Sequence, residues 1–316
     1  MKRLRIDRAY KVETLPTTGH TRSGLMRFGA VVFGVLALVI WLVAPAWATI
    51  YVTADDFAGT NLFGTLDPVT GQFTQVATID PLLLALTIGP GGSIIGADAN
   101  SGTLYAVSSS AMTAPFGSVT PPAPPPSAYY GLAYSSSAGN FFADFLDLDA
   151  MTVTLYSIAG DGNSSSSISE LAGPNSGFFP SGNLVFGPGG TLYFNYSSDT
   201  VSATNSTLYA VDTSSGTLTA IGSGMGTTIL ALFSDGTTLY GLDAFDTSGI
   251  GVFRIDTTTG IATQISTVTG LPGDNFVIDA ATSAVPEPNT LALLSVALLV
   301  AAAFAGASAN ASRAPS

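Results

Sequence analysis

The stretch that decides the fold is residues 184–194, LVFGPGGTLYF, an apolar run, a glycine-rich turn and a second apolar run. Similar stretches occupy residues 86–96 (LTIGPGGSIIG) and 232–241 (LFSDGTTLYG), and weaker copies begin at Leu132 and Phe276. The copies start at intervals of roughly 44–52 residues, and self-similarity at such a period indicates a repeat architecture. The sequence therefore indicates a chain built from repeats.

A second motif follows the first within the repeats. Residues 208–221 (LYAVDTSSGTLTAI) show an apolar pair, then Asp, then Gly four positions later and Thr-rich alternation. The same order recurs in residues 62–79 and 252–265, so that the three aspartates are Asp67, Asp212 and Asp256. An Asp side chain can accept hydrogen bonds from a turn, and Gly supplies the positive φ that closes it. We expect these carboxylates to form turns, with ligand binding as the alternative.

The repeat unit has the size of a propeller blade. Within its segments apolar and polar residues alternate with period two, and Gly, Asp, Pro and Ser bound the segments. This pattern indicates strands. Residues 49–284 hold about five such units of four strands. Residues 50–79 lack a first strand, whereas residues 274–281 (DNFVIDAA) form a first strand with no blade after it. We predict an all-β, five-bladed propeller whose terminal strands together complete one blade. The alternative is an open β-solenoid or sandwich array.

The blades resemble a broad family of bacterial propellers with a Leu-Tyr-x-x-Asp-x-x-(Ser/Thr)-Gly repeat. Residues 208–216 (LYAVDTSSG) carry that pattern. The family is too varied for the resemblance to imply one activity.

The N-terminal segment is typical of a secretory signal peptide. Residues 28–44 are an apolar run that basic residues precede, and Ala46 and Ala48 flank Trp47 in an A-x-A cleavage pattern. We expect a signal peptide at residues 1–48 with cleavage after Ala48. Met26 would begin a signal of conventional length and is an alternative start. A retained membrane anchor is the other interpretation.

The C-terminal segment, residues 285–316, contains Pro286-Glu287-Pro288, an apolar run at 291–306 and the basic residue Arg313. This order resembles the PEP-CTERM sorting signal, a Pro-Glu-Pro motif followed by a transmembrane helix and a basic tail. The resemblance implies processing by exosortase, a membrane protease-transpeptidase, in the envelope of a Gram-negative, exopolysaccharide-producing bacterium. The family usually has a cluster of basic residues where this chain has Arg313 alone. A plain C-terminal membrane anchor is the alternative.

The composition of residues 49–285 excludes several function classes. This region contains eighteen acidic side chains, one cationic side chain, Arg254, and no His, Cys, Lys or Trp. Histidine-based acid–base catalysis, a Schiff-base lysine and a His or Cys zinc site are therefore excluded from it. A surface of this charge repels nucleic acid, so we expect no nucleic-acid partner.

Carboxylates and aromatic rings supply the remaining candidate site residues. Hard cations such as Ca²⁺ prefer oxygen ligands, and the candidates for calcium are Asp55, Asp56, Asp147 and Asp149. Carbohydrates stack on aromatic faces, and the adjacent aromatic pairs are Tyr129, Tyr130, Phe178 and Phe179. Packing between blades is the alternative for every aromatic residue. No cofactor other than calcium is expected.

Together these patterns predict an exported, exosortase-processed protein of the cell surface or extracellular matrix, with a structural or adhesive role and no catalysis. The expected partners are signal peptidase and exosortase, the membrane through the C-terminal helix before processing, and extracellular polysaccharide. One alternative is a carbohydrate-binding propeller assisted by calcium. The other is a glycosidase, which would need two carboxyl groups about 5–9 Å apart.

Overall fold

The computed structural model describes residues 48–55, 61–99, 101–108, 110, 113–117, 119–120, 122, 127–147, 149–150, 152–172, 183–196, 206–243, 249–272 and 276–283. The predicted signal peptide, apart from its last residue, Ala48, and the predicted sorting signal lie outside these residues. Within the described ranges, no helix has the length and apolar character that a membrane crossing requires.

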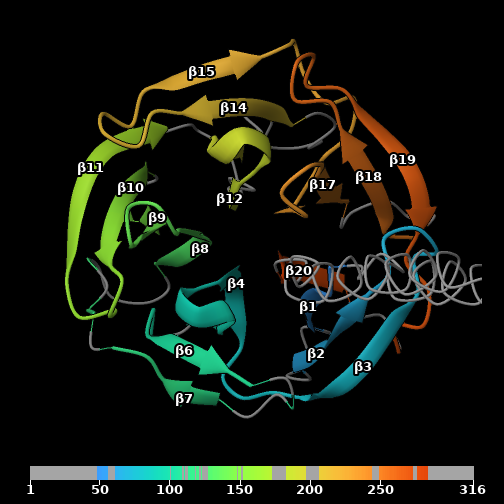
Figure 1. The fold of residues 1–316 in the computed structure, drawn as a ribbon, viewed down its shortest axis with the longest axis horizontal. Helices are drawn as coiled ribbons and strands as arrows, with labels where there is room; N and C mark the ends of the chain where they lie inside the picture. The colour runs from blue at the N-terminus through green and yellow to red at the C-terminus, as the bar shows by residue number, and fades with distance from the viewer. Residues whose placement is uncertain are drawn as a thin grey trace, which may run out of the picture. The chain divides into compact units, whose positions relative to one another are not determined.

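In the described part of the chain, twenty strands form five four-stranded antiparallel sheets, the blades of a propeller (Figure 1). Blade 1 contains β20 (Phe276–Thr282), β1 (Ile50–Asp55), β2 (Asn61–Leu66) and β3 (Phe73–Thr78). Blade 2 contains β4 (Leu83–Ile88), β5 (Ile94–Asp98), β6 (Leu104–Val107) and β7 (Thr113–Pro115). Blade 3 contains β8 (Ala128–Ser135), β9 (Asn140–Asp147), β10 (Thr152–Ala159) and β11 (Ser165–Ala172).

Blade 4 contains β12 (Asn183–Phe186), β13 (Leu192–Tyr196), β14 (Thr207–Val211) and β15 (Leu218–Ile221). Blade 5 contains β16 (Ala231–Ser234), β17 (Leu239–Leu242), β18 (Gly251–Ile255) and β19 (Ala262–Thr267). Two short 3-10 helices, η1 (Pro90–Gly92) and η2 (Pro188–Gly190), form the Gly-Pro-Gly-Gly turns of blades 2 and 4.

The first strand of each blade lies at the centre of the ring. These inner strands, β20, β4, β8, β12 and β16, contact one another in that order, and β16 contacts β20 again (Figure 1). The predicted five-bladed propeller is therefore confirmed, and the open array is wrong. Closure comes from β20, which pairs antiparallel with β1 from Ile50↔Thr282 to Asp55↔Phe276, as the incomplete terminal repeats predicted.

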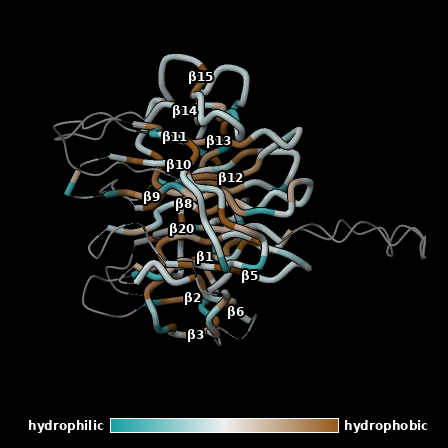
Figure 2. Tube along the Cα trace, turned by 90° about the vertical axis from the view of Figure 1, so that its left-hand side faces the viewer, coloured by the Kyte–Doolittle hydropathy of each residue, from teal (hydrophilic) through white to brown (hydrophobic). Residues whose placement is uncertain are grey.

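Burial decreases from the inner to the outer strands. The second strand β5 is buried at all five positions, whereas the outer strands β3 and β19 are mostly exposed. This gradient explains the sequence motifs. Strands that are buried on both faces have continuous apolar sequences, whereas the exposed outer strands have alternating sequences rich in Thr and Gln. In Figure 2 the hydrophobic stretches accordingly follow the strands inside the body.

The Asp-x-x-x-Gly motifs form turns, as expected. Asp67 Oδ1 accepts hydrogen bonds from the backbone N–H groups of Val69 (2.8 Å) and Thr70 (3.2 Å), and Gly71 adopts φ +74°. Asp212 and Asp256 make the equivalent bonds in blades 4 and 5. Each turn joins the third strand of a blade to its outer strand, and in blade 1 these are β2 and β3, because β20 supplies the first.

The hydrophobic core consists of clusters between adjacent blades. One cluster joins blades 5 and 1 through residues such as Phe73, Phe233 and Val277. The other four clusters occupy the remaining seams of the ring. Because every blade packs on two neighbours, no blade can bury its two faces without the closed ring.

Candidate functional site on the propeller axis

The inner strands place one residue each at corresponding positions, four residues before the turn that ends each strand. These five residues are Asp279, Ala85, Gly131, Asn183 and Ala231. Their register partners on the second strands are, in the same order, Thr53, Ala97, Asp144, Asn195 and Leu242. All ten residues are buried. We call this set the axial layer, and it holds two carboxylates and two amides.

A hydrogen bond in this layer links two blades that are not neighbours. Asn183 Nδ2 on β12 donates to Asp279 Oδ1 on β20 at 2.5 Å. Asp279 Oδ1 also accepts from its neighbour's backbone, Ala280 N, at 2.7 Å, and Oδ2 accepts from Leu86 N on β4 at 2.5 Å. The carboxyl group of Asp279 therefore joins strands of blades 1, 2 and 4.

Asn195 fixes the position of Asn183. Its Oδ1 accepts a hydrogen bond from Asn183 N at 3.0 Å, and its Nδ2 donates to Ile229 O at 2.6 Å. The chain of polar contacts thus continues from Asp279 through blade 4 to the segment that leads into blade 5. Since each of these groups is buried, the bonds offset the cost of removing amides from water.

Asp144 enters the layer through a gap at Gly131. A Cβ atom placed on Gly131 would lie 2.2 Å from Asp144 Oδ1, so only glycine leaves room for this side chain. Asp144 is 1% exposed, and its Oδ1 has no hydrogen-bond partner. A buried acceptor without a partner is costly, so this oxygen is one of the unsatisfied atoms of the layer.

Burial dominates the electrostatics of both carboxyl groups. It raises the pKa of Asp144 to about 7, against the opposing effect of the backbone N–H groups of Asp144 and Gly131. Burial also raises the pKa of Asp279 well above its ordinary value, although its hydrogen bonds with Leu86, Ala280 and Asn183 act in the opposite direction. The negative charge of Asp144 raises the pKa of Asp279 further, so the two groups interact.

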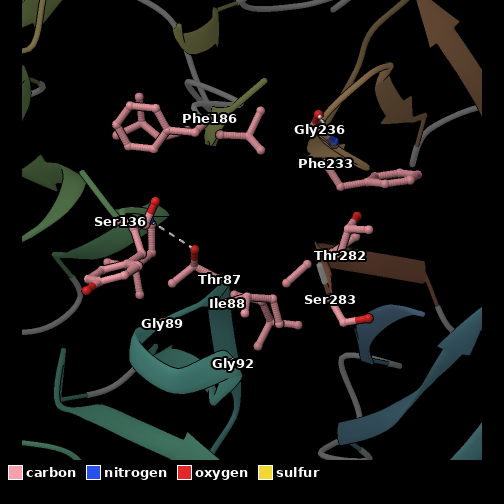
Figure 3. A pocket seen from close by; sticks show the side chains of 18 of the residues that line it. Thr87, Ile88, Gly89, Gly92, Ser136, Phe186, Phe233, Gly236, Thr282 and Ser283 are labelled. Carbon is pink, nitrogen blue, oxygen red and sulfur yellow. Dashed lines mark hydrogen bonds between the residues drawn. The ribbon is translucent and has the colours of Figure 1, made fainter. Parts of the chain in front are cut away.

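A funnel opens directly above the axial layer and encloses about 690 Å³ (Figure 3). Its lining includes the residue that follows the layer on each inner strand, namely Leu86, Leu132, Leu184, Leu232 and Ala280. Phe186, Phe233 and Tyr134 line the wall with hydroxyl groups such as that of Thr87, which accepts a hydrogen bond from Tyr134 N at 3.2 Å. The funnel lining therefore combines apolar side chains next to the layer with hydroxyl groups elsewhere.

Among the described residues that line the funnel, Asp235 is the one carboxylate. Its Oδ1 accepts bonds from Thr237 N (2.8 Å), Thr237 Oγ1 (2.8 Å) and Thr238 N (2.7 Å). Tyr240 OH donates to its Oδ2 at 3.2 Å. This carboxylate is thus a turn-forming group, and the lining as described offers no pair of carboxylates for acid–base chemistry.

The candidate calcium residues do not come together. Asp55 is buried at the end of β1 in blade 1, whereas Asp147 ends β9 in blade 3 and Asp149 follows it. Asp56 falls outside the described residues. Asp147 Oδ1 accepts bonds from Asp149 N and Ala150 N, both at 3.0 Å, so this pair forms a turn. The described part of the chain contains no group of three or more His, Cys, Asp or Glu side chains placed to hold a metal ion.

Of the four candidate aromatic residues, two pack in the core and two lie outside the described residues. Tyr129 is 0% exposed and packs edge-to-face on Phe145 and Tyr156, with ring centroids 5.3 and 6.4 Å apart. Its ring faces therefore cannot stack on a sugar, and the packing alternative is correct for this residue. Tyr130 is partly buried in the cluster between blades 3 and 4. Phe178 and Phe179 lie outside the described residues.

Sequence reasoning missed Asp144 and Asp279. Both lie within apolar strand sequences, FFADFL and FVIDAA, where a lone carboxylate interrupts residues destined for the core. That interruption was the available signal, because buried charges occur in apolar strands only where something compensates them.

Comparison with known proteins finds similar solved structures but no family. Neither a family model nor a curated protein matches the sequence. Similar solved structures include TolB from Acinetobacter baumannii, with 14% identity and a TM-score of 0.46 over 82% of this chain. This chain spans 61% of that TolB chain.

Two further similar structures have still lower TM-scores. A protein of unknown function from Bacteroides caccae is 10% identical, with a TM-score of 0.45 over 75% of this chain and 99% of its own. A streptogramin B lyase is 19% identical, with a TM-score of 0.41 over 72% of each chain. At such values the likeness carries no argument about activity.

Proposed function

We propose that this chain is an exported protein of the cell surface or extracellular matrix of a Gram-negative bacterium, processed by signal peptidase and exosortase, with a structural or adhesive role. One observation carries the proposal. Thr49 N donates to Ser283 Oγ at 3.0 Å, and Ser283 N donates to Thr49 O at 2.8 Å. The two ends of the propeller thus meet at one point of blade 1.

This junction fits processing at both ends. Cleavage after Ala48 would leave Thr49, and the Pro286-Glu287-Pro288 motif begins three residues after Ser283. Both predicted cleavage regions therefore lie outside the closed ring, and processing would remove no strand. A fold that ends within a few residues of both signals is what a processed, freestanding domain requires.

The funnel supports binding in preference to catalysis. Its lining combines leucine and phenylalanine side chains with hydroxyl groups, and the one carboxylate among its described residues, that of Asp235, accepts the hydrogen bonds of a turn. Asp144 and Asp279 are 1% and 0% exposed, too deeply buried to touch a substrate. A glycosidase would need two accessible carboxyl groups, so we place this alternative last.

Carbohydrate binding is the second candidate function. Phe186 and Tyr134, both partly exposed, line the funnel beside Thr87 and Ser136 hydroxyls, a combination that sugars use for stacking and hydrogen bonding. A glycan array read with and without calcium tests it. Binding that Phe186→Ala and Tyr134→Ala both abolish would support the funnel as the site, whereas binding unchanged by either substitution would exclude it.

Processing is tested by mass spectrometry of the mature termini in secreted and membrane fractions. We expect an N-terminus at Thr49 and loss of the apolar segment after Pro288. Replacing Pro286, Glu287 and Pro288 with alanine should leave the chain in the membrane fraction. An intact C-terminus in a strain with active exosortase would contradict the proposal, and the same strain without exosortase is the control.

A further inference from the structure

The axial layer holds two buried carboxyl groups, those of Asp144 and Asp279, and no positive side chain among its described residues. Asn183 lies next to both groups, because its Nδ2 donates to Asp279 Oδ1 at 2.5 Å and a Cβ atom placed on Gly131 would lie 2.2 Å from Asp144 Oδ1 and 3.0 Å from Asn183 Cα. Within the described residues, the one cationic side chain is that of Arg254, which is exposed on β18, opposite Tyr240 in the sheet register. Two buried carboxylates without a cation are strongly unfavourable, so a positive species is expected in the layer.

The layer also contains unused oxygen atoms. Asp144 Oδ1 has no hydrogen-bond partner although the side chain is 1% exposed. Thr53, which faces Asp279 across the β1–β20 register, is also 1% exposed and has an unpartnered Oγ1. Oxygen atoms left without donors inside a protein are what a hard cation would use as ligands.

The neighbouring axial positions hold small side chains. Ala85, Ala231 and Gly131 occupy three of the five inner-strand positions, and the Cβ that Gly131 lacks would collide with Asp144 Oδ1. The carboxyl groups of Asp144 and Asp279 and the hydroxyl group of Thr53 therefore belong to a layer in which the other inner-strand side chains, apart from Asn183, are short.

We propose that the axial layer is a calcium site, in which Asp144 Oδ1 binds the ion and the carboxyl group of Asp279 supplies the second negative charge. A divalent ion neutralises two carboxylates, and Ca²⁺ accepts oxygen ligands in irregular arrangements. Mg²⁺ holds its own water molecules more tightly and fits a fully buried layer less well. Thiolates and imidazoles are absent from residues 49–285, which disfavours softer metals.

The funnel provides the route to this site. An ion that enters from the funnel passes the lining residues that follow the layer on the inner strands, Leu86, Leu132, Leu184, Leu232 and Ala280. The site is separate from the Asp147–Asp149 turn and from Asp55, which the sequence had indicated for calcium. Calcium binding at this site does not depend on how the chain is exported.

The test uses the full-length chain, stripped with a chelator and held at pH 8 in a mild detergent. Calorimetric titration should show one Ca²⁺ per chain, and saturating Ca²⁺ should raise the Tm by about 5–10 °C, with a smaller effect of Mg²⁺. Asp144→Asn should abolish both effects. Asp147→Asn, in a turn of the same blade, is the matched control and should retain them.

A second measurement needs no substitution, in case Asp144→Asn does not fold. Tb³⁺ replaces Ca²⁺ in oxygen sites and emits when a nearby tyrosine transfers energy to it. Tyr130 is the nearby tyrosine. Burial raises its pKa, and the charge of Asp144 raises it further. We expect sensitised Tb³⁺ emission that Ca²⁺ displaces. No calcium binding by calorimetry, together with no displaceable Tb³⁺ emission, would overturn the proposal and leave a proton as the compensating species.

Discussion

Asn183 on β12 and Asp279 on β20 are 96 residues apart, and a 2.5 Å hydrogen bond joins their side chains. The two strands are not neighbours in the ring, because β16 lies between them on one side and β4 and β8 on the other. The bond therefore crosses the centre of the propeller. It ties the blade that closes the ring to a blade that the closure does not otherwise touch.

Removing this bond should destabilise the whole ring. Asn183→Ala deletes the donor to Asp279 Oδ1 and leaves a small cavity in a layer that is 0–2% exposed at both residues. A lost hydrogen bond to a buried charged or polar group costs about 1.5–3 kcal/mol, and the cavity adds to that cost. We expect a loss of about 2–4 kcal/mol in urea unfolding. Thr74→Ala, on the exposed strand β3, is the control, and an equal effect of both changes would disprove the role of the axial bond.

Gly131→Ala should be more harmful than a glycine substitution at a turn. The new Cβ would lie 2.2 Å from Asp144 Oδ1 and 2.5 Å from Leu184 N, and the second contact, which is with the backbone of β12, cannot relax without moving β8 away from β12. Overpacking of this kind costs about 1–3 kcal/mol or more. Gly91→Ala, at φ +66° with open space around it, is the comparison, because it carries only the cost of a left-handed backbone.

Thermal unfolding of the two variants measures the difference. We expect Gly131→Ala to have the lower Tm, by several degrees, with unfolding still cooperative. If Gly91→Ala proved the more destabilising of the two, Asp144 would not occupy the space beside Gly131.

The turn aspartates should make stability depend on pH on the acid side. The side-chain and backbone hydrogen bonds of Ser214 lower the pKa of Asp212, and those of Thr258 lower the pKa of Asp256. For Asp67, burial acts to raise the pKa, but the N–H groups of Val69 and Thr70 outweigh it. A folded-state pKa below the ordinary value of 3.8 means that stability is present above pH 3.8 and is lost as pH falls through the folded pKa.

The measurement is the urea midpoint between about pH 5 and pH 2 for the wild-type chain and for a variant with all three aspartates changed to asparagine. Asparagine retains an oxygen acceptor but does not titrate, so the variant should lose less stability over this range. A larger loss in the variant than in the wild type would show that these turns do not hold ionised carboxylates.

The turn chemistry and the repeat period made the fold predictable from the sequence. Asp67, Asp212 and Asp256 each precede a glycine by four positions, and this local pattern identifies the turn before the outer strand of three blades without any knowledge of the tertiary structure. Ring closure was predictable for a similar reason. The repeat beginning at Phe276 has one strand and the repeat at residues 50–79 has three, so only their union makes a blade.

The axial layer was not predictable in this way. Whether Asp144 points to solvent or to the axis depends on Gly131, its register partner on β8, and on Leu184 in the next blade. Such contacts form only when blades assemble, and no local pattern encodes them. The same holds for Tyr129, whose place beside Tyr130 suggested an exposed ring, but whose strand is covered on that face by blade 3's own aromatic residues. Adjacent aromatic residues face opposite sides of a strand, and here both sides are packed.

Ring closure yields the last prediction. A chain of residues 49–270 lacks β20, so β1 loses its partner along Ile50–Asp55 and becomes an exposed edge. Val277 and Ala280 leave the cluster between blades 5 and 1, and Ala281 leaves the cluster between blades 1 and 2. The axial bonds that Asp279 makes to Leu86 and Asn183 disappear as well.

These losses fall on two seams and on the axis at once, so they cannot be confined to one blade. Burial of Val277 alone contributes about 1.5–3 kcal/mol, and with the lost strand pairing and axial bonds the total approaches the 5–15 kcal/mol that stabilises an ordinary domain. We expect residues 49–284 to unfold in a single cooperative transition, and residues 49–270 to be insoluble or to lack one. Circular dichroism and calorimetry of the two chains provide the comparison. Equal melting temperatures would mean that the terminal strand can be lost cheaply, as in an open array, and the closed ring would then not be what stabilises this protein.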